Sequence, residues 1–337
     1  MMKPATNGVP QASLKSQQLH PIDANHHRQL MDYVRIARVD HWFKNIFVIP
    51  GVALALALTD ATFVESVPNI IIALISVSLI ASANYVINEL LDAPFDRHHP
   101  KKRNRPAASG RIEPIYAYTE YAALALVGLG LSASIGRLHL SLSTLLLVMG
   151  VIYNVRPFRS KDRAYLDVLS ESVNNPIRLM LGWAAVTSIA LPPSSSLLAY
   201  WMGGAFLMAV KRLAEYRFIN DGGKAAEYRR SFAAYTEEKL LVSSFFYALS
   251  SAFFLGVFLI KYRVEFLLSF PLLSLLFTWY LAIGLSAESP AQHPERLYRE
   301  KKFVGFVIFL CAVTACLFFY DIPDLAVLME PVRFTED

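Results

Sequence analysis

Long apolar stretches alternate with short polar segments along most of this chain. Most of the stretches approach or exceed the roughly 20 residues that a helix needs to cross a hydrocarbon core of about 30 Å. The pattern predicts an all-α, polytopic membrane protein with about nine transmembrane helices, of which the first and the sixth are short. The nine stretches are Trp42–Leu58, Ile70–Leu91, Ile115–Ile135, Leu138–Tyr153, Leu166–Leu191, Leu197–Val210, Leu240–Ile260, Phe266–Leu285 and Phe303–Phe319.

The composition and the charge distribution agree with this assignment. Hydrophobic residues make up 55% of the 337 residues and charged residues only 18%, which is far more apolar than a soluble domain of this length requires. Of the 32 Lys and Arg residues, 27 lie in alternate connecting segments, and such residues are retained on the cytoplasmic side of a membrane. We therefore expect the N-terminus and these segments in the cytoplasm. The segments are 1–45, 93–114, 154–165, 211–239 and 287–302.

The two ends of the chain are polar compared with the part between them. Residues 1–27 are rich in His, Gln, Asn and Pro and predict a disordered cytosolic tail. Residues 28–320 form one transmembrane domain, and 321–337 are a short C-terminal tail. Cys311 and Cys316 lie in the last apolar stretch, so they indicate neither a disulfide nor a zinc site. The net charge of +5 suits anionic lipid headgroups, and no basic–aromatic arrangement suggests a nucleic acid partner.

A stripe of polar side chains ends the second apolar stretch. Asn84, Asn88, Asp92 and Asp96 follow one another at a spacing of four, so they share one face of a helix. Oxygen ligands without Cys or His select Mg²⁺ or Mn²⁺, and a solvated helix end is the alternative. Because proline interrupts helices, Pro94 predicts that the helix breaks near Asp92 and that Asp96 belongs to the loop.

A second acidic segment, KDRAYLDVLSESVNNPIR (161–178), begins the fifth stretch. Asp162 and Asp167 are predicted to face the first stripe across a cavity, where two acidic clusters around a divalent ion suit a diphosphate. Arg178 lies within the stretch and needs a partner, either Glu171 or Asn174 or a substrate phosphate. A purely structural buried network is the alternative.

These motifs resemble those of the UbiA superfamily of intramembrane prenyltransferases over residues 30–320. The resemblance is carried by Asn88-xxx-Asp92-xxx-Asp96, by a further acidic motif after the fourth stretch, and by nine predicted helices. It implies helices around a central cavity that opens toward the membrane, with Mg²⁺-bound diphosphate between the motifs. It also implies catalytic roles for Asp92, Asp96 and Asp167. The implied metal ligands are Asn88, Asp92, Asp96, Asp162 and Asp167.

Three segments resemble the decaprenyl-phosphate phosphoribosyltransferase branch of this superfamily: RVDHWFKN (38–45), HPKKRNRPAASG (99–110) and KRLAE (211–215). The chain departs from that branch at Glu89, where an Asp usually follows the Asn. The resemblance implies a bacterial-type inner-membrane enzyme that transfers a 5-phosphoribosyl group from phosphoribosyl diphosphate to a polyprenyl phosphate.

Two anionic substrates require positive charge, and the predicted cytoplasmic segments supply it. For any single residue, the alternative explanation is the retention of Lys and Arg on the cytoplasmic side. No general base is required, because a phosphate acceptor is already ionised at neutral pH. The candidate substrate-binding residues are Asn84, Lys44, Lys101, Arg103, Arg105, Lys161, Glu171, Arg178 and Lys211.

Two other functions fit parts of the pattern. One is transfer of a prenyl group from its diphosphate to an aromatic or other small acceptor. The other is a non-enzymatic transporter or lipid-binding scaffold with an ion site. Transporters usually place intramembrane charges near the midplane on broken helices, whereas here they gather at the cytoplasmic ends.

Overall fold

The computed structural model describes residues 30–325, apart from 98–101, 220–221, 263, 287–288, 293–296, 298 and 324. The predicted N-terminal tail, the C-terminal tail from residue 326 onward and the candidate Lys101 lie outside the described residues.

The described part of the chain is mostly helical and contains no strand, which confirms the predicted all-α class. Helices satisfy every backbone polar group within one segment, as apolar surroundings require. The α-helices are α2 (Ile49–Leu58), α3 (Phe63–Asp96), α4 (Pro114–Ile135), α5 (Arg137–Asn154), α6 (Leu166–Ser172), α7 (Asn174–Val186), α8 (Ser194–Ile219), α9 (Gly222–Tyr228), α10 (Glu237–Tyr262), α11 (Phe270–Leu285) and α12 (Lys301–Phe319). The 3-10 segments are η1 (Val39–Val48), η2 (Lys102–Asn104), η3 (Ser160–Asp162), η4 (Arg230–Ala233), η5 (Val264–Ser269) and η6 (Pro290–Gln292).

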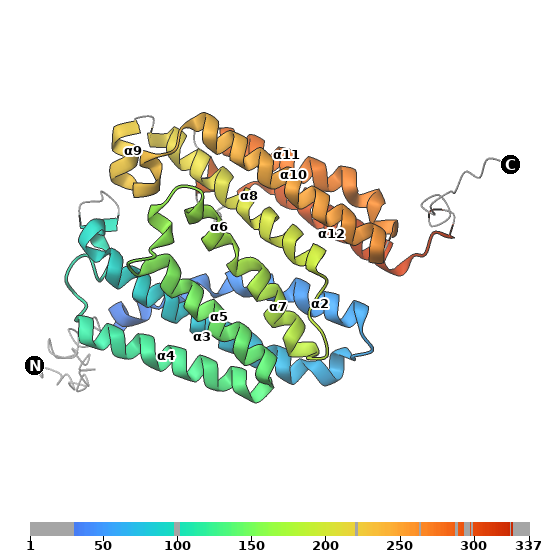
Figure 1. Ribbon diagram of the computed structural model, residues 1–337, viewed down its shortest axis with the longest axis horizontal. Helices are drawn as coiled ribbons and strands as arrows, with labels where there is room; N and C mark the ends of the chain where they lie inside the picture. Colours follow the sequence, from blue (N-terminus) through green and yellow to red (C-terminus); the bar gives the residue numbers. More distant parts are fainter. Residues whose placement is uncertain are drawn as a thin grey trace, which may run out of the picture.

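The long helices run side by side in two groups (Figure 1). One group contains α2, α3, α4, α5 and α7, and the other contains α8, α10, α11 and α12. Helix α7 contacts members of both groups. The C-terminal ends of α3, α5 and α8 and the N-terminal ends of α4, α6 and α10 gather at one end of the bundle, on the left of Figure 1. The loops that carry the acidic motifs therefore meet there, and we call this the acidic end.

Among the residues that the structure describes, seven helical segments are long and apolar enough to cross a membrane. The predicted count of nine is not confirmed. The fifth predicted span is divided into α6 and α7 around Val173, because Pro176 has no N–H to bond the carbonyl of Ser172. The ninth corresponds to the 19-residue α12, which is not among the seven.

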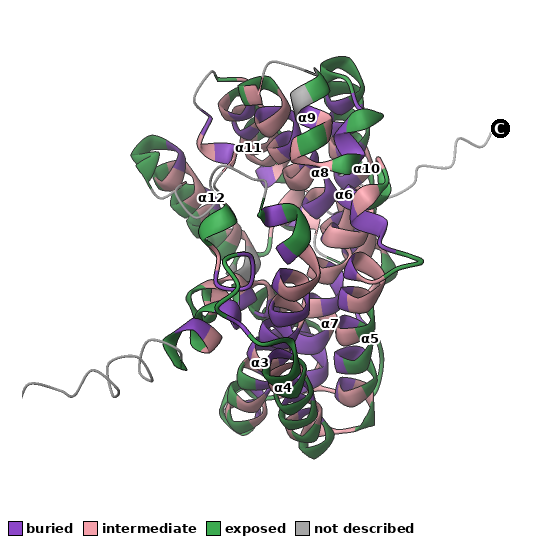
Figure 2. Cartoon of the chain, turned by 90° about the vertical axis from the view of Figure 1, so that its left-hand side faces the viewer, coloured by how far each residue is buried: buried purple, intermediate pink, exposed green. Residues whose placement is uncertain are grey.

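The outer faces of the helices carry large apolar side chains. Leu126 on α4, Phe253 on α10 and Ile308 on α12 are each more than 60% exposed, at 70%, 65% and 64%. Viewed from the acidic end, buried residues lie between the helices and exposed ones on their outer sides (Figure 2). Such a surface suits lipid rather than water, in agreement with an integral membrane protein.

The end of α3 differs from the sequence expectation. Helix α3 continues through Pro94 to Asp96, so Asp96 is helical and not part of the loop. Pro94 lies in the last turn, where few further helical hydrogen bonds remain for it to remove. The loop also holds this end, since Arg97 donates from Nε to the carbonyl of Ala108 at 3.2 Å.

Candidate active site

Helix α3 places the four polar residues of the first motif along one face, as the spacing of four predicts. The two amides bind the neighbouring α5. Asn84 donates from Nδ2 to the carbonyl of Leu146 at 3.0 Å, and Asn88 donates to the side-chain oxygen of Asn154. Both therefore hold α3 against α5, while the carboxylates of the motif lie closer to the acidic end.

Both carboxylates of the first motif have basic partners from loops. Lys161 and Arg159 donate to Oδ1 of Asp92 at 2.6 and 2.8 Å. Arg105 donates to Oδ2 of Asp96 at 2.7 Å. These contacts bring the predicted residues Lys161 and Arg105 to the motif, and they add Arg159, which we had not selected as a site residue.

The segment before α6 is built around Arg159. This residue has a left-handed backbone, with φ 29°, and its Nε donates to Oδ2 of Asp162 at 3.0 Å. Arg159 therefore contacts both Asp92 and Asp162 and brings the two carboxylates close together. Lys161 is buried here, which lowers its pKa to about 8 although the adjacent Asp92 opposes the shift.

Asp167, at the start of α6, is fully enclosed by donors. Tyr235 donates to its Oδ1 at 2.9 Å, while Ser231 and Arg212 donate to its Oδ2 at 3.0 and 3.2 Å. The side chain of Asp167 has no exposed surface. Burial, followed by the charge of Asp167, raises the pKa of Tyr235, which keeps the phenol protonated as a donor.

Arg212 on α8 is the centre of this second region. Its side chain is 1% exposed and pairs with Asp167 at 3.2 Å, Glu171 at 2.7 Å and Glu215 at 3.3 Å. Arg229 approaches Asp167 at 3.8 Å. The predicted Lys211 also contributes positive charge near Glu171 and Glu215. Sequence reasoning missed Arg212 and Arg229, although Arg212 lies within an apolar helix end, where a charge needs a partner.

The other predicted substrate-binding residues lie apart from the carboxylate contacts just described. Arg103 is exposed on η2. Lys44 is half-buried on η1, with its ammonium 6.0 Å from the ring centroid of Phe43. Arg178 on α7 donates from Nε to Oδ1 of Asn45 at 3.2 Å. The partner of this hydrogen bond is therefore neither Glu171 nor the side chain of Asn174, which the sequence suggests.

Several oxygens at the acidic end have no hydrogen-bond partner in the described chain and are accessible. Some side-chain atoms of the described residues are fully buried and have no partner, but these oxygens are not among them. They belong to the oxygen class that Mg²⁺ prefers. No three His, Cys, Asp or Glu residues in the described part lie close enough to hold a metal alone, so water and substrate phosphates would complete the coordination. These oxygens include Oδ1 of Asn88, Oδ2 of Asp92, Oδ1 of Asp96, Oδ1 of Asp162 and Oε1 of Glu171.

Asp167 fits a metal-binding role less well than these residues. Both of its oxygens are occupied by protein donors, and no solvent reaches them. Its position in this structure suits a residue that holds the loop of Ser231 and Tyr235 against α6.

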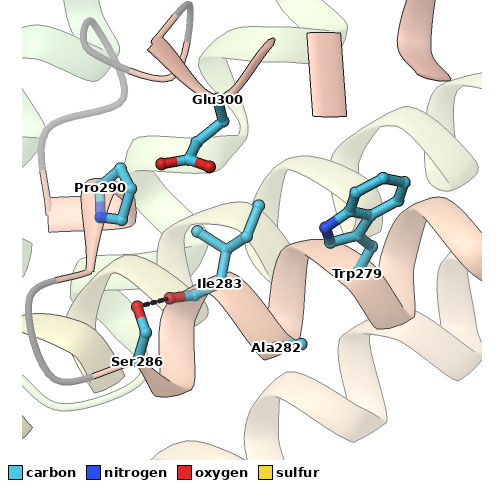
Figure 3. A pocket seen from close by; sticks show the side chains of 6 residues that line it. All are labelled: Trp279, Ala282, Ile283, Ser286, Pro290 and Glu300. Atoms are coloured by element: carbon cyan, nitrogen blue, oxygen red, sulfur yellow. Dashed lines mark hydrogen bonds between the residues drawn. The ribbon is translucent and has the colours of Figure 1, made fainter. Parts of the chain in front are cut away.

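A pocket of about 440 Å³ lies between α11 and the segment that leads to α12 (Figure 3). It is formed by α11, η6 and the residue that precedes α12, and none of the predicted site residues lines it. Its lining residues are Trp279, Ala282, Ile283, Ser286, Pro290 and Glu300.

Comparison with known proteins defines the class. The UbiA prenyltransferase family model matches residues 46–310, so the chain belongs to this family and is an intramembrane transferase. A UbiA homolog from Archaeoglobus fulgidus, bound to DMAPP and Mg²⁺, shares the fold with a TM-score of 0.64 over 85% of this chain and 99% of that chain, at 18% identity.

Two relatives within the family have the same, more specific name. Decaprenyl-phosphate phosphoribosyltransferase from Mycobacterium tuberculosis is 31% identical over 208 residues, which are 61% of this chain and 67% of the relative. The enzyme of the same name from Mycolicibacterium smegmatis is 29% identical over 209 residues, which are 61% of this chain and 63% of the relative.

Proposed function

We propose that this protein transfers a 5-phosphoribosyl group from phosphoribosyl diphosphate to a polyprenyl phosphate and releases diphosphate. The observation that carries the proposal is the pairing of acidic and basic side chains at one end of the bundle. Asp92, Asp96 and Asp167 each already have a basic partner. A bound divalent cation would leave this site with surplus positive charge, which two anionic substrates need and a neutral aromatic acceptor does not.

We infer that Mg²⁺, with Mn²⁺ as the alternative, takes one or two protein ligands from the open oxygens of Asn88, Asp92, Asp96, Asp162 and Glu171, and the remaining ligands from water and substrate phosphates. When bound, the metal would neutralise the diphosphate as its bond to the anomeric carbon breaks. The solved homolog that holds DMAPP and Mg²⁺ supports divalent-metal use on this fold.

The cations around the motif have separate roles in this proposal. Lys161 and Arg159 meet at Asp92 and are placed to bind diphosphate oxygens. Arg105 comes from the loop after α3, where it contacts Asp96, and we assign it to the 5-phosphate of the ribose. The acceptor phosphate is ionised at neutral pH and attacks without a general base. The acidic end would face the cytoplasm, where the soluble donor is available, and the distribution of Lys and Arg supports this orientation.

Two parallel reactions test the proposal. Purified protein in detergent is incubated with Mg²⁺, a polyprenyl phosphate and ribose-labelled phosphoribosyl diphosphate. A second sample receives a labelled prenyl diphosphate and aromatic acceptors. We expect ribose label in the lipid phase, and loss of that transfer in EDTA. Prenyl label on the aromatic acceptor without ribose transfer would instead make the protein a prenyltransferase.

A further inference from the structure

Arg178 lies in the interior of the bundle, on a helix surrounded by others. Helix α7 packs against η1, α2, α3, α5 and α8. The guanidinium makes two long hydrogen bonds, to Oδ1 of Asn45 at 3.2 Å and to the carbonyl of Asn174 at 3.5 Å. Both partners are neutral, so neither compensates the positive charge.

No carboxylate in the described chain pairs with Arg178. The phenols of Tyr85 on α3 and Tyr200 on α8 lie near it, and the hydroxyl of Tyr200 donates to the carbonyl of Phe47 at 3.4 Å. A buried cation without a counter-charge is unfavourable by several kcal/mol in low-dielectric surroundings. Intramembrane arginines therefore pair with an anion, and here the described residues do not supply one.

The unused donors of Arg178 are not fully buried. A guanidinium has five N–H groups, and only two are used by the contacts above. No nitrogen atom of Arg178 is both fully buried and without a partner. The hydroxyl of Tyr85 has no hydrogen bond in the described chain, and it is not fully buried either. The free donors of Arg178 and Tyr85 are thus both open to a ligand.

These donors lie close to the acidic end of the bundle. Arg178 bonds the carbonyl of Asn174, four residues earlier, so its side chain extends back toward the start of α7 and the acidic end. Tyr85 precedes Asn88 of the first motif by three residues, or about one helical turn. Tyr85 also lies in electrostatic range of both Arg178 and Glu171. The open donors therefore adjoin the acidic site on its membrane-interior side.

We propose that Arg178 and Tyr85, with Asn45 holding the guanidinium, form a second anion site, which binds the phosphate of the lipid acceptor. We call these three residues the Arg178 cluster. A ligand phosphate here lies beside the acidic site, while its prenyl tail remains among apolar helices. The assignment to an acceptor rests on the proposed function, whereas the anion site itself rests on the uncompensated charge.

Direct binding tests the cluster without any donor. Wild-type protein in detergent is titrated with a polyprenyl phosphate, with the polyprenol of equal chain length, and with inorganic phosphate. We expect the lipid phosphate to bind at least about tenfold more tightly than the polyprenol, as a charge-assisted contact predicts. Arg178→Gln should abolish this preference, Arg178→Lys should keep part of it, and Tyr85→Phe should reduce it a few-fold. Arg137→Gln, at the opposite end of the bundle, is the matched control and should bind as the wild type does.

Kinetics and stability complete the test. Arg178→Gln should raise KM for the polyprenyl phosphate at least tenfold and leave KM for the ribosyl donor within about twofold. Its thermal midpoint should be equal to or above that of the wild type, because an uncompensated charge is removed.

Three results would overturn the inference. They are an unchanged phosphate preference in Arg178→Gln, a marked loss of its thermal stability, or displacement of the lipid by inorganic phosphate at equal concentration. Absence of ribose transfer together with an Arg178-dependent phosphate preference would contradict the proposed function and leave the anion site standing.

Discussion

The two acidic motifs lie at the same end of the bundle but use their carboxylates differently. In the first motif, Asp92 and Asp96 each present one oxygen to basic loop residues and leave the other open. In the second, Asp167 is fully buried and both of its oxygens are bound by protein donors. The difference separates an open region, suited to a ligand, from a closed one that holds α6, α8 and the 229–235 loop together. Glu171 belongs to both, because one of its oxygens binds Arg212 and the other is open.

The largest effect on activity is expected at the open region. Asp92→Asn replaces a charged oxygen that we assign to the metal. Loss of even an outer partner of a metal site reduces activity about 10–100-fold, so we expect this change to reduce turnover by more than about a hundredfold. The thermal midpoint should change little, since Asp92 is partly exposed. Asp60→Asn, in the exposed turn between α2 and α3, is the control, and activity of Asp92→Asn near the wild-type level would refute a metal role.

The closed region should respond through stability instead. Arg212→Met leaves three carboxylates without their central partner, and removing one member of a buried ion pair typically costs about 3–5 kcal/mol. We expect a strongly lowered thermal midpoint and poor recovery of folded protein. Arg217→Met provides the comparison, because the Arg217–Glu237 pair is exposed and such pairs contribute about 0–1 kcal/mol. Wild-type stability with lost turnover in Arg212→Met would show that the closed region binds substrate.

The sequence predicted the open region better than the closed one. A spacing of four within one helix is a local property, so Asn84, Asn88 and Asp92 were correctly placed on one face, whereas Asp96 was assigned to the loop although it lies in the helix. The closed region depends on contacts between distant segments. Arg212 is separated by 45 residues from Asp167, and no spacing rule relates two residues on different helices.

The effects of two prolines on the helices were not predicted correctly from the sequence. Pro94 was expected to end α3, but the helix continues for two more residues because the end is held by the loop. Pro176 coincides with a break that the apolar pattern did not predict, since hydropathy records the polarity of residues and not the hydrogen bonds of the backbone.

An intermediate effect is expected from the loop after α3. Arg105 contacts Asp96 and is half-buried, whereas Arg103, two residues earlier, is exposed. Arg105→Ala should raise KM for phosphoribosyl diphosphate about tenfold, which corresponds to about 1.4 kcal/mol of lost binding. Arg103→Ala is the matched variant and should have a smaller effect. Equal effects of the two variants would mean that the general charge of the loop matters and not the contact with Asp96.

The smallest effect concerns Tyr153, which lies between the two regions. Its hydroxyl donates to Glu171 at 3.0 Å, and its ring lies 5.8 Å from the ammonium of Lys161. Tyr153→Phe keeps the ring and removes one hydrogen bond, which typically contributes about 0.5–1.5 kcal/mol. We therefore expect a two- to tenfold lower kcat/KM, and initial rates with Tyr118→Phe, an exposed position on α4, provide the control.

A double-mutant cycle then measures whether Tyr153 links the regions. Lys161→Met and Tyr153→Phe are combined, and the change in kcat/KM is compared with the product of the single changes. If Tyr153 positions Glu171 for the same substrate that Lys161 binds, the two changes should be non-additive. Independent effects would mean that the open and closed regions act separately, and that the hydroxyl of Tyr153 only stabilises the closed one.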